Sequence, residues 1–252
     1  MSDRVLVARA GGVLTGTLNR PDKKNAVDSA MIDDLYGLLE QAELDATVRV
    51  VALRGAGKDF CAGMDLEELL ASADRTVEDN REAALRFGGL FIRMRALPKP
   101  VIAVVQGRAL AGGCGLATAC DLVLAAASAQ LGYPEVQRGF VPALVMNMLR
   151  RAAGEKVAFD LAATGRLVSA LEAERIGLVS RVFAEEVFEQ QVDEVLKGLA
   201  GISASALALT KQQFYALDGV SFEDGIRLSA DVNAVSRTTP DFRSAIAAFL
   251  KR

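Results

Sequence analysis

Residues 100–121 read PVIAVVQGRALAGGCGLATACD, and this stretch decides the fold. Residues 101–105 form a short, continuous apolar run, which predicts a strand buried on both faces. The run stops at Gln106-Gly107, and the small residues from 111 to 119 predict a helix that packs closely against its surroundings. A helix begins with backbone N–H groups that lack intrahelical partners, and glycines let another group approach them. The stretch therefore predicts a strand, a turn and a helix N-terminus that favours a negatively charged oxygen atom.

A second segment of the same kind lies upstream. Residues 48–54, VRVVALR, again predict a short apolar strand, which runs into the glycine-containing loop of residues 55–66, GAGKDFCAGMDL. A lone Gly-Gly pair at a helix start more often serves close packing. Two such loops on neighbouring strands could direct two N–H groups at one point, so the pair supports a functional interpretation that one loop alone does not.

Five segments resemble the crotonase family, also called the enoyl-CoA hydratase/isomerase family. They are LNRPDKKNAVD at 18–28, FCAGMDL at 60–66, GRALAGGCGLATACDLVLAA at 107–126, LGYPEVQRGFVP at 131–142 and LAATGRLVSALEAERIGLVSRV at 161–182. The resemblance covers nearly the whole chain in order. It implies an α/β fold, a crotonase-like spiral of stacked ββα/βαβ turns over residues 1–183, and a C-terminal helical trimerisation region over residues 184–252. It also implies thioester chemistry on acyl-CoA substrates.

Length and composition narrow the class of protein. A chain of 252 residues that is 51% hydrophobic can build one large domain with a substantial core. It has no apolar run of 18 residues and its start lacks the apolar core of a signal peptide, so we expect a soluble, cytoplasmic protein. The net charge of −3 and the pI near 5.3 give no attraction for nucleic acid or an anionic membrane.

The absence of histidine excludes several kinds of active site. No Ser-His-Asp or Cys-His arrangement, histidine-ligated zinc or imidazole base can form. Acid–base catalysis would therefore have to use carboxylates, lysine, tyrosine, cysteine or the backbone. The cysteines Cys61, Cys114 and Cys120 lack a CxxC pair and stand among small apolar residues, so we expect buried thiols in a reducing compartment and no metal site.

The remaining pattern predicts β structure first and helices last. We expect a hairpin of residues 4–8 and 13–18, a helix capped by Ser29, helices over 65–73 and 76–97, and strands over 122–126 and 178–182. Residues 131–136 are expected to be extended, and Asp121 to bind backbone amides at a turn. From residue 184 onward only helices are predicted: 184–200, 204–217, 221–236 and 239–250. Because this tail has no sheet of its own to cover, we expect it to pack on other subunits, as the family's trimers imply.

Glu135 is the main catalytic candidate. Its carboxyl group follows a proline and stands among apolar residues, where desolvation would raise its pKa and suit it to carry a proton near neutral pH. The resemblance places Glu135 at the family's catalytic glutamate. It also assigns the backbone N–H groups of Met64 and Gly112 as two donors that would stabilise a thioester enolate.

Further positions are assigned by the resemblance to the binding of substrate. The loop of residues 20–25 would lie along coenzyme A, and Phe249 and Arg252 would approach the adenine and phosphates of a neighbouring subunit's coenzyme A. The full predicted set is Lys24, Ala26, Ala62, Asp65, Leu66, Gly113, Tyr133, Phe249 and Arg252. No resident cofactor or metal is expected, since coenzyme A enters as part of the substrate. The expected partners are an acyl-CoA thioester and other copies of the chain in a homotrimer or a dimer of trimers, with no nucleic acid and no membrane.

The sequence departs from the family's hydratases at one position. Those enzymes typically hold water between two glutamates, and Gly115 stands where one of them would fall. A single carboxylate suits a Δ3-Δ2-enoyl-CoA isomerase, although a one-glutamate enoyl-CoA hydratase stays open. Glu68, Asp74 or Tyr133 could supply a relocated partner.

Three alternatives to these two activities remain at this point. The chain could be a hydratase of branched glutaconyl-type thioesters in which Arg138 receives a substrate carboxylate. It could be a non-catalytic CoA-binding or assembly protein. RNA binding, known for some relatives, is disfavoured by the acidic pI and the lack of a basic, aromatic patch.

Overall fold

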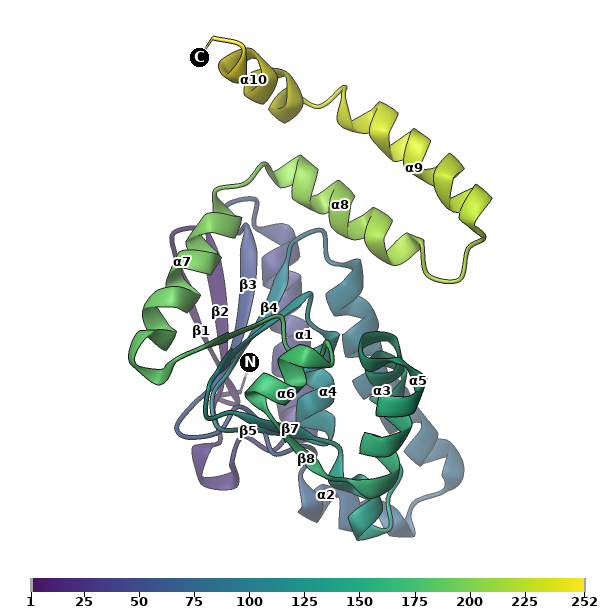
Figure 1. Ribbon diagram of the computed structural model, residues 1–252. Helices are drawn as coiled ribbons and strands as arrows, with labels where there is room; N and C mark the ends of the chain where they lie inside the picture. The colour runs from purple at the N-terminus through teal and green to yellow at the C-terminus, as the bar shows by residue number, and fades with distance from the viewer. Residues whose placement is uncertain (1, 252) are drawn as a thin grey trace.

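The computed structural model describes residues 2–251, and its centre is a six-stranded sheet (Figure 1). The strand order is β1-β2-β3-β4-β6-β9. The predicted hairpin of β1 and β2 is antiparallel, and every later pair of neighbours is parallel. The strands are β1 (Val5–Ala10), β2 (Val13–Leu18), β3 (Val50–Gly55), β4 (Val101–Val105), β6 (Leu122–Ala126) and β9 (Arg181–Phe183). Parallel neighbours need crossover connections, so this order confirms the predicted α/β fold.

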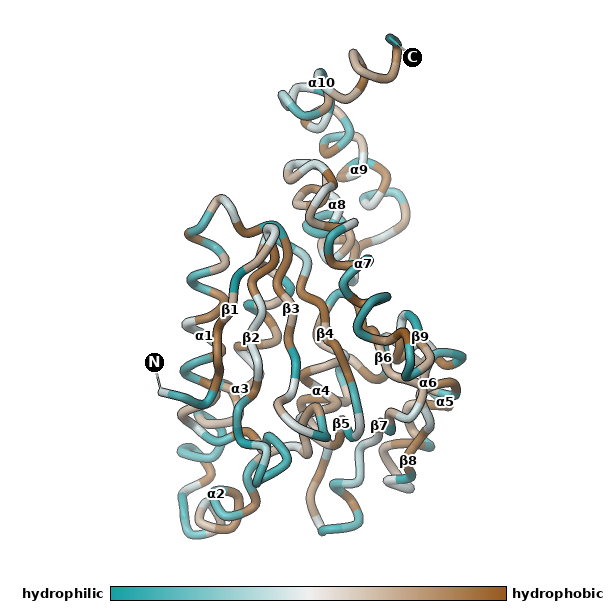
Figure 2. Tube along the Cα trace, turned by 90° about the vertical axis from the view of Figure 1, so that its left-hand side faces the viewer, coloured by the Kyte–Doolittle hydropathy of each residue, from teal (hydrophilic) through white to brown (hydrophobic). Residues whose placement is uncertain are grey.

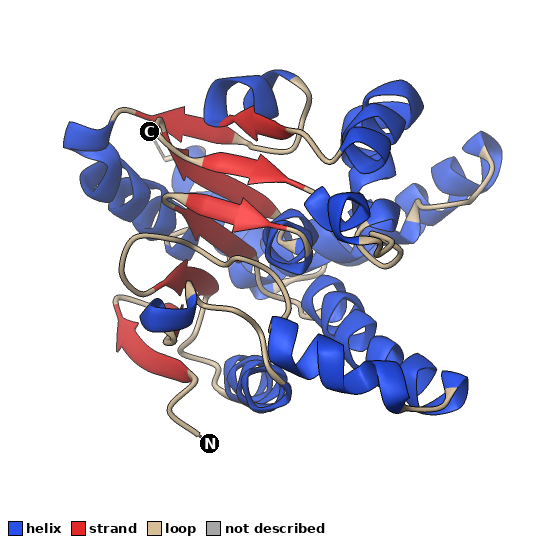
Figure 3. Cartoon of the chain, turned by 90° about the horizontal axis from the view of Figure 1, so that it is seen from below, coloured by secondary structure: helices blue, strands red, loops and turns tan. Residues whose placement is uncertain are grey.

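Ten α-helices lie along residues 2–251, and helices lie on both sides of the strands (Figure 3). They are α1 (Ser29–Leu44), α2 (Leu66–Ala71), α3 (Val77–Ala96), α4 (Gly112–Ala119), α5 (Met146–Thr164), α6 (Ala170–Arg175), α7 (Phe188–Ala200), α8 (Ala204–Ala216), α9 (Phe222–Ser236) and α10 (Pro240–Phe249). The predicted cap of α1 is wrong by one residue. Asp28 accepts a hydrogen bond from the Met31 N–H, because a carboxylate one position earlier reaches the free amides of the first turn.

The sheet is buried between two apolar layers. All five residues of β4 are buried, and Figure 2 shows this strand as hydrophobic along its length. One face packs on α1, α3 and α4, and the other on α7 through Phe188, Val192 and Leu196. The prediction that the tail from residue 184 covers no sheet of its own is therefore wrong for α7, whose three apolar residues recur at intervals of four on one helix face.

A second, three-stranded sheet lies beside the first, and the segment that contains Glu135 follows one of its strands. It consists of β5 (Arg108–Leu110), β7 (Gln130–Gly132) and β8 (Leu167–Ser169), in the order β5-β7-β8. Residues 131–136 are not one extended piece as predicted. The chain leaves β7 at Gly132 and turns into a short 3-10 helix, Pro134–Arg138, because Pro134 fixes the backbone dihedral φ in the range that begins a helix.

The last three helices extend away from the sheets (Figures 1 and 2). Lys211 on α8 attaches these helices to the rest of the protein. Its buried ammonium group lies 2.7 Å from Asp121 and donates to the Met94 and Lys99 carbonyl oxygens. Asp121 also accepts from the Val101 N–H and the Tyr215 hydroxyl, which confirms its predicted structural role. Within the described residues, no helix has the length and apolar character needed to cross a membrane.

Candidate active site

The two glycine-containing loops meet edge to edge. Cys61 pairs with Ala109 as in a parallel sheet: the Cys61 N–H donates to the Arg108 carbonyl (3.0 Å), and the Leu110 N–H donates to the Cys61 carbonyl (2.9 Å). A Cβ atom at position 113 would overlap the Cys61 carbonyl oxygen. Gly113 is therefore required for this close approach of two backbones. Gly113 is buried beside Cys61, and its role in substrate binding stays a prediction.

Met64 and Gly112, the two residues with predicted N–H donors, lie next to each other. The Cγ atom of Met64 stands 3.4 Å from the point that a Cβ atom on Gly112 would occupy. The Gly112 nitrogen stands 3.5 Å from the point that a Cβ atom on Gly63 would occupy. Gly112 is the first residue of α4, where backbone N–H groups have no acceptor within the helix. The loops thus bring the two predicted donor residues to one place.

The backbone before α4 is held in an uncommon conformation. Ala111 has a backbone φ of 51° and ψ of −127°, a conformation that residues other than glycine rarely adopt. Such a conformation costs about 1–3 kcal/mol and persists only where its surroundings enforce it. The Ala111 N–H donates to the Gly132 carbonyl oxygen at 2.8 Å, at the end of β7. This bond links the start of α4 to the segment that carries Glu135.

Glu135 presents a buried carboxyl group beside these loops. The residue is 8% exposed, and within residues 2–251 its Oε2 atom has no hydrogen-bond partner. Burial raises the pKa of Glu135 above its ordinary value of 4.5, while a hydrogen bond from its own backbone N–H and the positive charge of Arg138 offset part of the shift. A carboxyl group with a raised pKa and a free oxygen can both accept and return a proton.

The space next to Gly115 is filled by apolar side chains. Gly115 follows Gly112 by three residues, so both lie on one face of α4. A Cβ atom at position 115 would overlap Cγ1 of Val145 and would lie 3.7 Å from Cζ of Phe91. Val145 is 3% exposed, and Phe91 makes an edge-to-face contact with Phe87 at 4.7 Å between ring centres. The sequence pattern did not indicate this wall, because Val145 comes from a different segment of the chain.

The predicted coenzyme A loop lies against the first glycine loop. The Ala62 N–H donates to the Lys24 carbonyl oxygen at 3.0 Å, and Lys24 itself is exposed. Ala26 and Ala62 are half-buried, and Leu66 is exposed at the start of α2. The structure therefore groups these four residues on one rim, next to Met64.

Asp65 and Tyr133, both predicted to bind substrate, have partners within the protein. Asp65 is buried, lies 2.8 Å from Arg20 and caps α2 by accepting from the Glu67 N–H. Burial alone would raise its pKa, but the hydrogen bonds from Arg20 and from α2 hold the pKa below its usual value. Tyr133 has no exposed surface, and its hydroxyl lies 3.2 Å from the Thr118 hydroxyl. Both side chains are buried against the protein in this structure, and their part in substrate binding stays a prediction.

The C-terminal candidates lie apart from the site. Phe249 is 72% exposed on α10, at the end of the molecule opposite α2 (Figure 1). It is therefore placed to reach another molecule and does not reach the glycine loops of its own chain. Arg252 lies outside the described residues.

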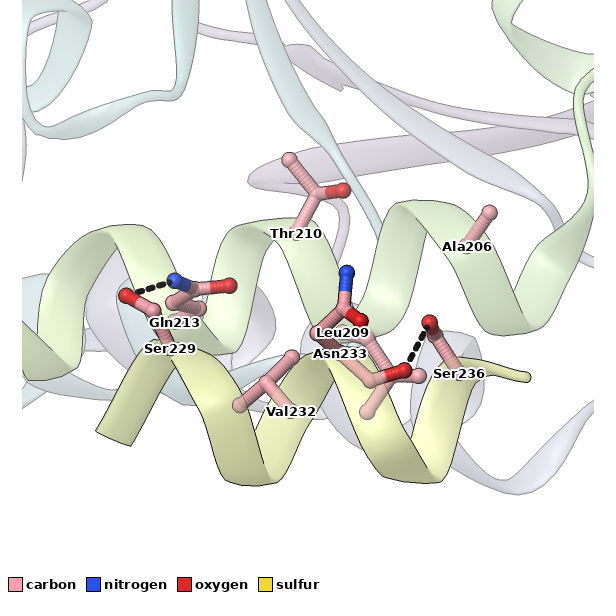
Figure 4. Close-up of a pocket in the computed structure, with 8 residues that line it drawn as sticks. All are labelled: Ala206, Leu209, Thr210, Gln213, Ser229, Val232, Asn233 and Ser236. Atoms are coloured by element: carbon pink, nitrogen blue, oxygen red, sulfur yellow. Dashed lines mark hydrogen bonds between the residues drawn. The ribbon is translucent and has the colours of Figure 1, made fainter. Parts of the chain in front are cut away.

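Two surface depressions also lie away from Glu135. One is a groove of about 390 Å³ between α8 and α9, where Gln213 donates to the Ser229 hydroxyl (Figure 4). The other lies between α1 and α3, at Tyr36 and Arg93. In the described part of the chain, no three His, Cys, Asp or Glu side chains are grouped as metal ligands. Neither depression therefore competes with Glu135 as the centre of the site.

Known proteins share this architecture along its whole length. A model of the family described as enoyl-CoA hydratase/isomerase matches residues 8–252. A Thermus thermophilus protein, provisionally assigned as an enoyl-CoA hydratase, is 43% identical over 242 residues, which is 96% of each chain. The Escherichia coli 2,3-dehydroadipyl-CoA hydratase is 33% identical, over 98% of this chain and 96% of its own. The crystal structure of an enoyl-CoA hydratase from Mycobacterium smegmatis superposes with a TM-score of 0.94 at 32% identity, over 98% and 96% of the two chains.

These matches agree with the spiral order of strands and with the two glycine loops that meet beside Glu135. They extend over the core and the C-terminal helices alike, since the family model spans residues 8–252 and the structural match covers 98% of the chain. This chain is a member of the enoyl-CoA hydratase/isomerase, or crotonase, family of enzymes.

Proposed function

We propose that this chain stabilises the enolate of an acyl-CoA thioester with the backbone N–H groups of Met64 and Gly112, and that Glu135 moves the proton. The observation that carries the proposal is the buried Glu135 carboxyl group, whose Oε2 has no partner within residues 2–251, beside the two joined loops. Removing a proton from C2 places negative charge on the thioester oxygen. Two fixed N–H donors stabilise that charge, and the loss of one typically costs about 3–4 kcal/mol.

The first candidate reaction is the isomerisation of a 3-enoyl-CoA to a 2-enoyl-CoA. Glu135 takes a proton from C2, the electrons spread from the thioester oxygen to C4, and Glu135 returns the proton to C4. One carboxyl group with a raised pKa is sufficient for both steps. Apolar Val145 and Phe91 at Gly115 also favour a reaction in which water takes no part.

The second candidate reaction is the hydration of a 2-enoyl-CoA. It is favoured by the names of the similar proteins, which include hydratases. In this reaction Glu135 alone would activate the water. An acyl group that carries its own carboxylate, as in a glutaconyl or adipyl thioester, would find the positive charge of Arg138 near Glu135.

A Glu135→Gln variant tests the proton-transfer role. It keeps the size of the side chain and removes its basicity, so we expect turnover of both 3-enoyl-CoA and 2-enoyl-CoA substrates to fall by about 10²–10⁴-fold. Calorimetry with a saturated acyl-CoA should give nearly unchanged affinity. Full turnover by the variant would refute the role of Glu135. If the wild-type protein binds the acyl-CoA but turns over none of the 3-enoyl-CoA and 2-enoyl-CoA substrates tested, the non-catalytic alternative is favoured.

A further inference from the structure

We infer that Val145 is a specificity-determining residue, which fills the space beside Gly115 and so excludes water and a second carboxylate from that side of the site. This inference rests on the proposed function, because it explains which of the two reactions the site favours. It assigns a role to the loop between Glu135 and α5, which the sequence pattern left unassigned.

The position of Val145 is fixed from three sides. It precedes α5, and α5 packs on both α4 and the 3-10 helix that carries Glu135. The Phe140 N–H donates to the Glu135 carbonyl oxygen at 3.1 Å, so the loop of residues 140–145 begins at the catalytic candidate itself. A Cβ atom on Gly88 would lie 3.3 Å from a methyl carbon of Leu144, the neighbour of Val145. The loop is thus packed against α3, and Val145 cannot easily move aside.

The contact with α4 leaves no room at position 115. A side chain there would overlap Cγ1 of Val145 and would lie 3.0 Å from its Cβ atom. Phe91 closes the other side at 3.7 Å, and Phe87 lies 3.4 Å from the corresponding point on Gly112. The face of α4 that begins at the predicted N–H donor therefore continues into a wall of hydrocarbon.

This wall has a chemical consequence. An ordered water needs two to four polar partners, and Val145, Phe91 and Phe87 provide none through their side chains. The 3-10 helix that carries Glu135 and the helix α4 both pack on α5, at whose start Val145 stands, so this wall closes the α4 side of the site. With water held away, a proton taken up by Glu135 returns to the substrate in preference to exchange with a hydroxyl donor. Isomerisation is then favoured over hydration by the shape of Val145.

Three variants test this role: Val145→Ala, Gly115→Glu, and both changes together. Each is compared with wild type in the ratio of 2-enoyl-CoA hydration to 3-enoyl-CoA isomerisation. We expect the double variant to raise this ratio by about tenfold or more, because the smaller side chain at position 145 leaves room for a second carboxylate that can hold water, whereas Val145→Ala alone opens an apolar space and should raise the ratio less. Val141→Ala, a change of the same size at an exposed position of the same loop, should leave the ratio unchanged.

The melting temperature provides a readout that does not depend on activity. Gly115→Glu alone should lower it strongly, because the new side chain overlaps Val145, and the double variant should recover at least half of the loss. The double variant should also show the largest ratio of hydration to isomerisation. Equal melting temperatures for Gly115→Glu and wild type, or a ratio that the double variant leaves unchanged, would overturn the inference. If wild type turns over neither substrate, the proposed function fails, and the melting temperatures still decide whether Val145 holds this space.

Discussion

The burial and the raised pKa of Glu135 depend on its neighbours, and the sequence predicted only some of these neighbours. The preceding proline and the nearby apolar residues were sufficient to predict desolvation, and the structure confirms a buried carboxyl group with a raised pKa. The wall formed by Val145 was not predictable, because no local pattern shows which distant residue will meet Gly115. The burial of Tyr133 was not predictable for the same reason, since its hydroxyl meets Thr118 in another element.

The charge of Arg138 should tune the pH dependence of the reaction. Glu135 must be ionised to remove the C2 proton, so kcat/KM should rise with pH through a pKa above 4.5 and then level off. Arg138→Gln removes a positive charge that lowers this pKa, and the rising limb should therefore move to higher pH. Arg150→Gln, which changes an exposed side chain on α5, is the control and should leave the rising limb in place. A limb that stays fixed or moves to lower pH in Arg138→Gln contradicts this account.

The two adjacent glycines at the start of α4 should respond differently to alanine. A Cβ atom at position 112 makes ordinary contacts of 3.4 Å, so Gly112→Ala should fold normally but lose about 10²-fold or more in kcat by obstructing the thioester oxygen. At position 113 the Cβ atom overlaps backbone, and Gly113→Ala should lose about 1–3 kcal/mol of stability. Urea unfolding and steady-state kinetics separate the two effects.

Met64→Leu is the matched control for these variants. It changes a side chain but keeps the backbone N–H, so kcat should stay within a few-fold of wild type. A large loss of kcat in Met64→Leu, with none in Gly112→Ala, would show that the backbone donors are wrongly assigned.

At the scale of elements, Arg20 holds the rim of the site together. Its guanidinium group is nearly buried and lies 3.2 Å from Asp28 and 2.8 Å from Asp65, the residues that cap α1 and α2, and it donates to the Ala26 carbonyl oxygen. Arg20→Met would leave two buried carboxylates without this partner. We expect a loss of about 3–5 kcal/mol in the free energy of unfolding.

The exposed pair of Lys197 and Asp193, one helical turn apart on α7, provides the comparison. Lys197→Met should cost at most about 1 kcal/mol, because solvent screens this pair. Chemical denaturation of both variants measures the difference. Equal losses would contradict the role given to Arg20.

Elements with a strong period were predictable, and short ones were not. The apolar runs predicted β3, β4 and β6. The polar–apolar pattern predicted α1, α3 and the helices after residue 204, and all these predictions lie within a few residues of the observed bounds. The three-residue strands β5 and β8 were missed, and β7 was predicted only as the start of an extended segment that runs too far, because so short a segment has no measurable alternation. They matter nonetheless, since β5 and β7 align the glycine loops with Glu135.

At the scale of the whole molecule, the C-terminal helices remain incompletely covered. Phe222 and Ile226 are exposed one turn apart on α9, and Phe249 is exposed on α10. We predict that other copies of the chain cover this surface, so that the protein sediments at three times 26.7 kDa or at twice that trimer mass.

A double change, Phe222→Asp with Ile226→Asp, should dissociate the assembly, while Glu223→Ala on the same helix should not. Analytical ultracentrifugation at micromolar concentration provides the masses. A monomeric wild-type protein, or an unchanged mass for the double variant, would contradict the predicted assembly.

The central claim is that two backbone N–H groups hold one thioester oxygen while Glu135 faces the reacting carbons. A crystal structure of Glu135→Gln with a bound 3-enoyl-CoA tests it most directly. We predict that the thioester oxygen lies about 2.7–3.1 Å from the nitrogen atoms of both Met64 and Gly112, with the position-135 side chain beside C2 and C4 and hydrocarbon from Val145 opposite. A thioester oxygen that contacts neither nitrogen, or a position-135 side chain turned away from C2, would contradict the account.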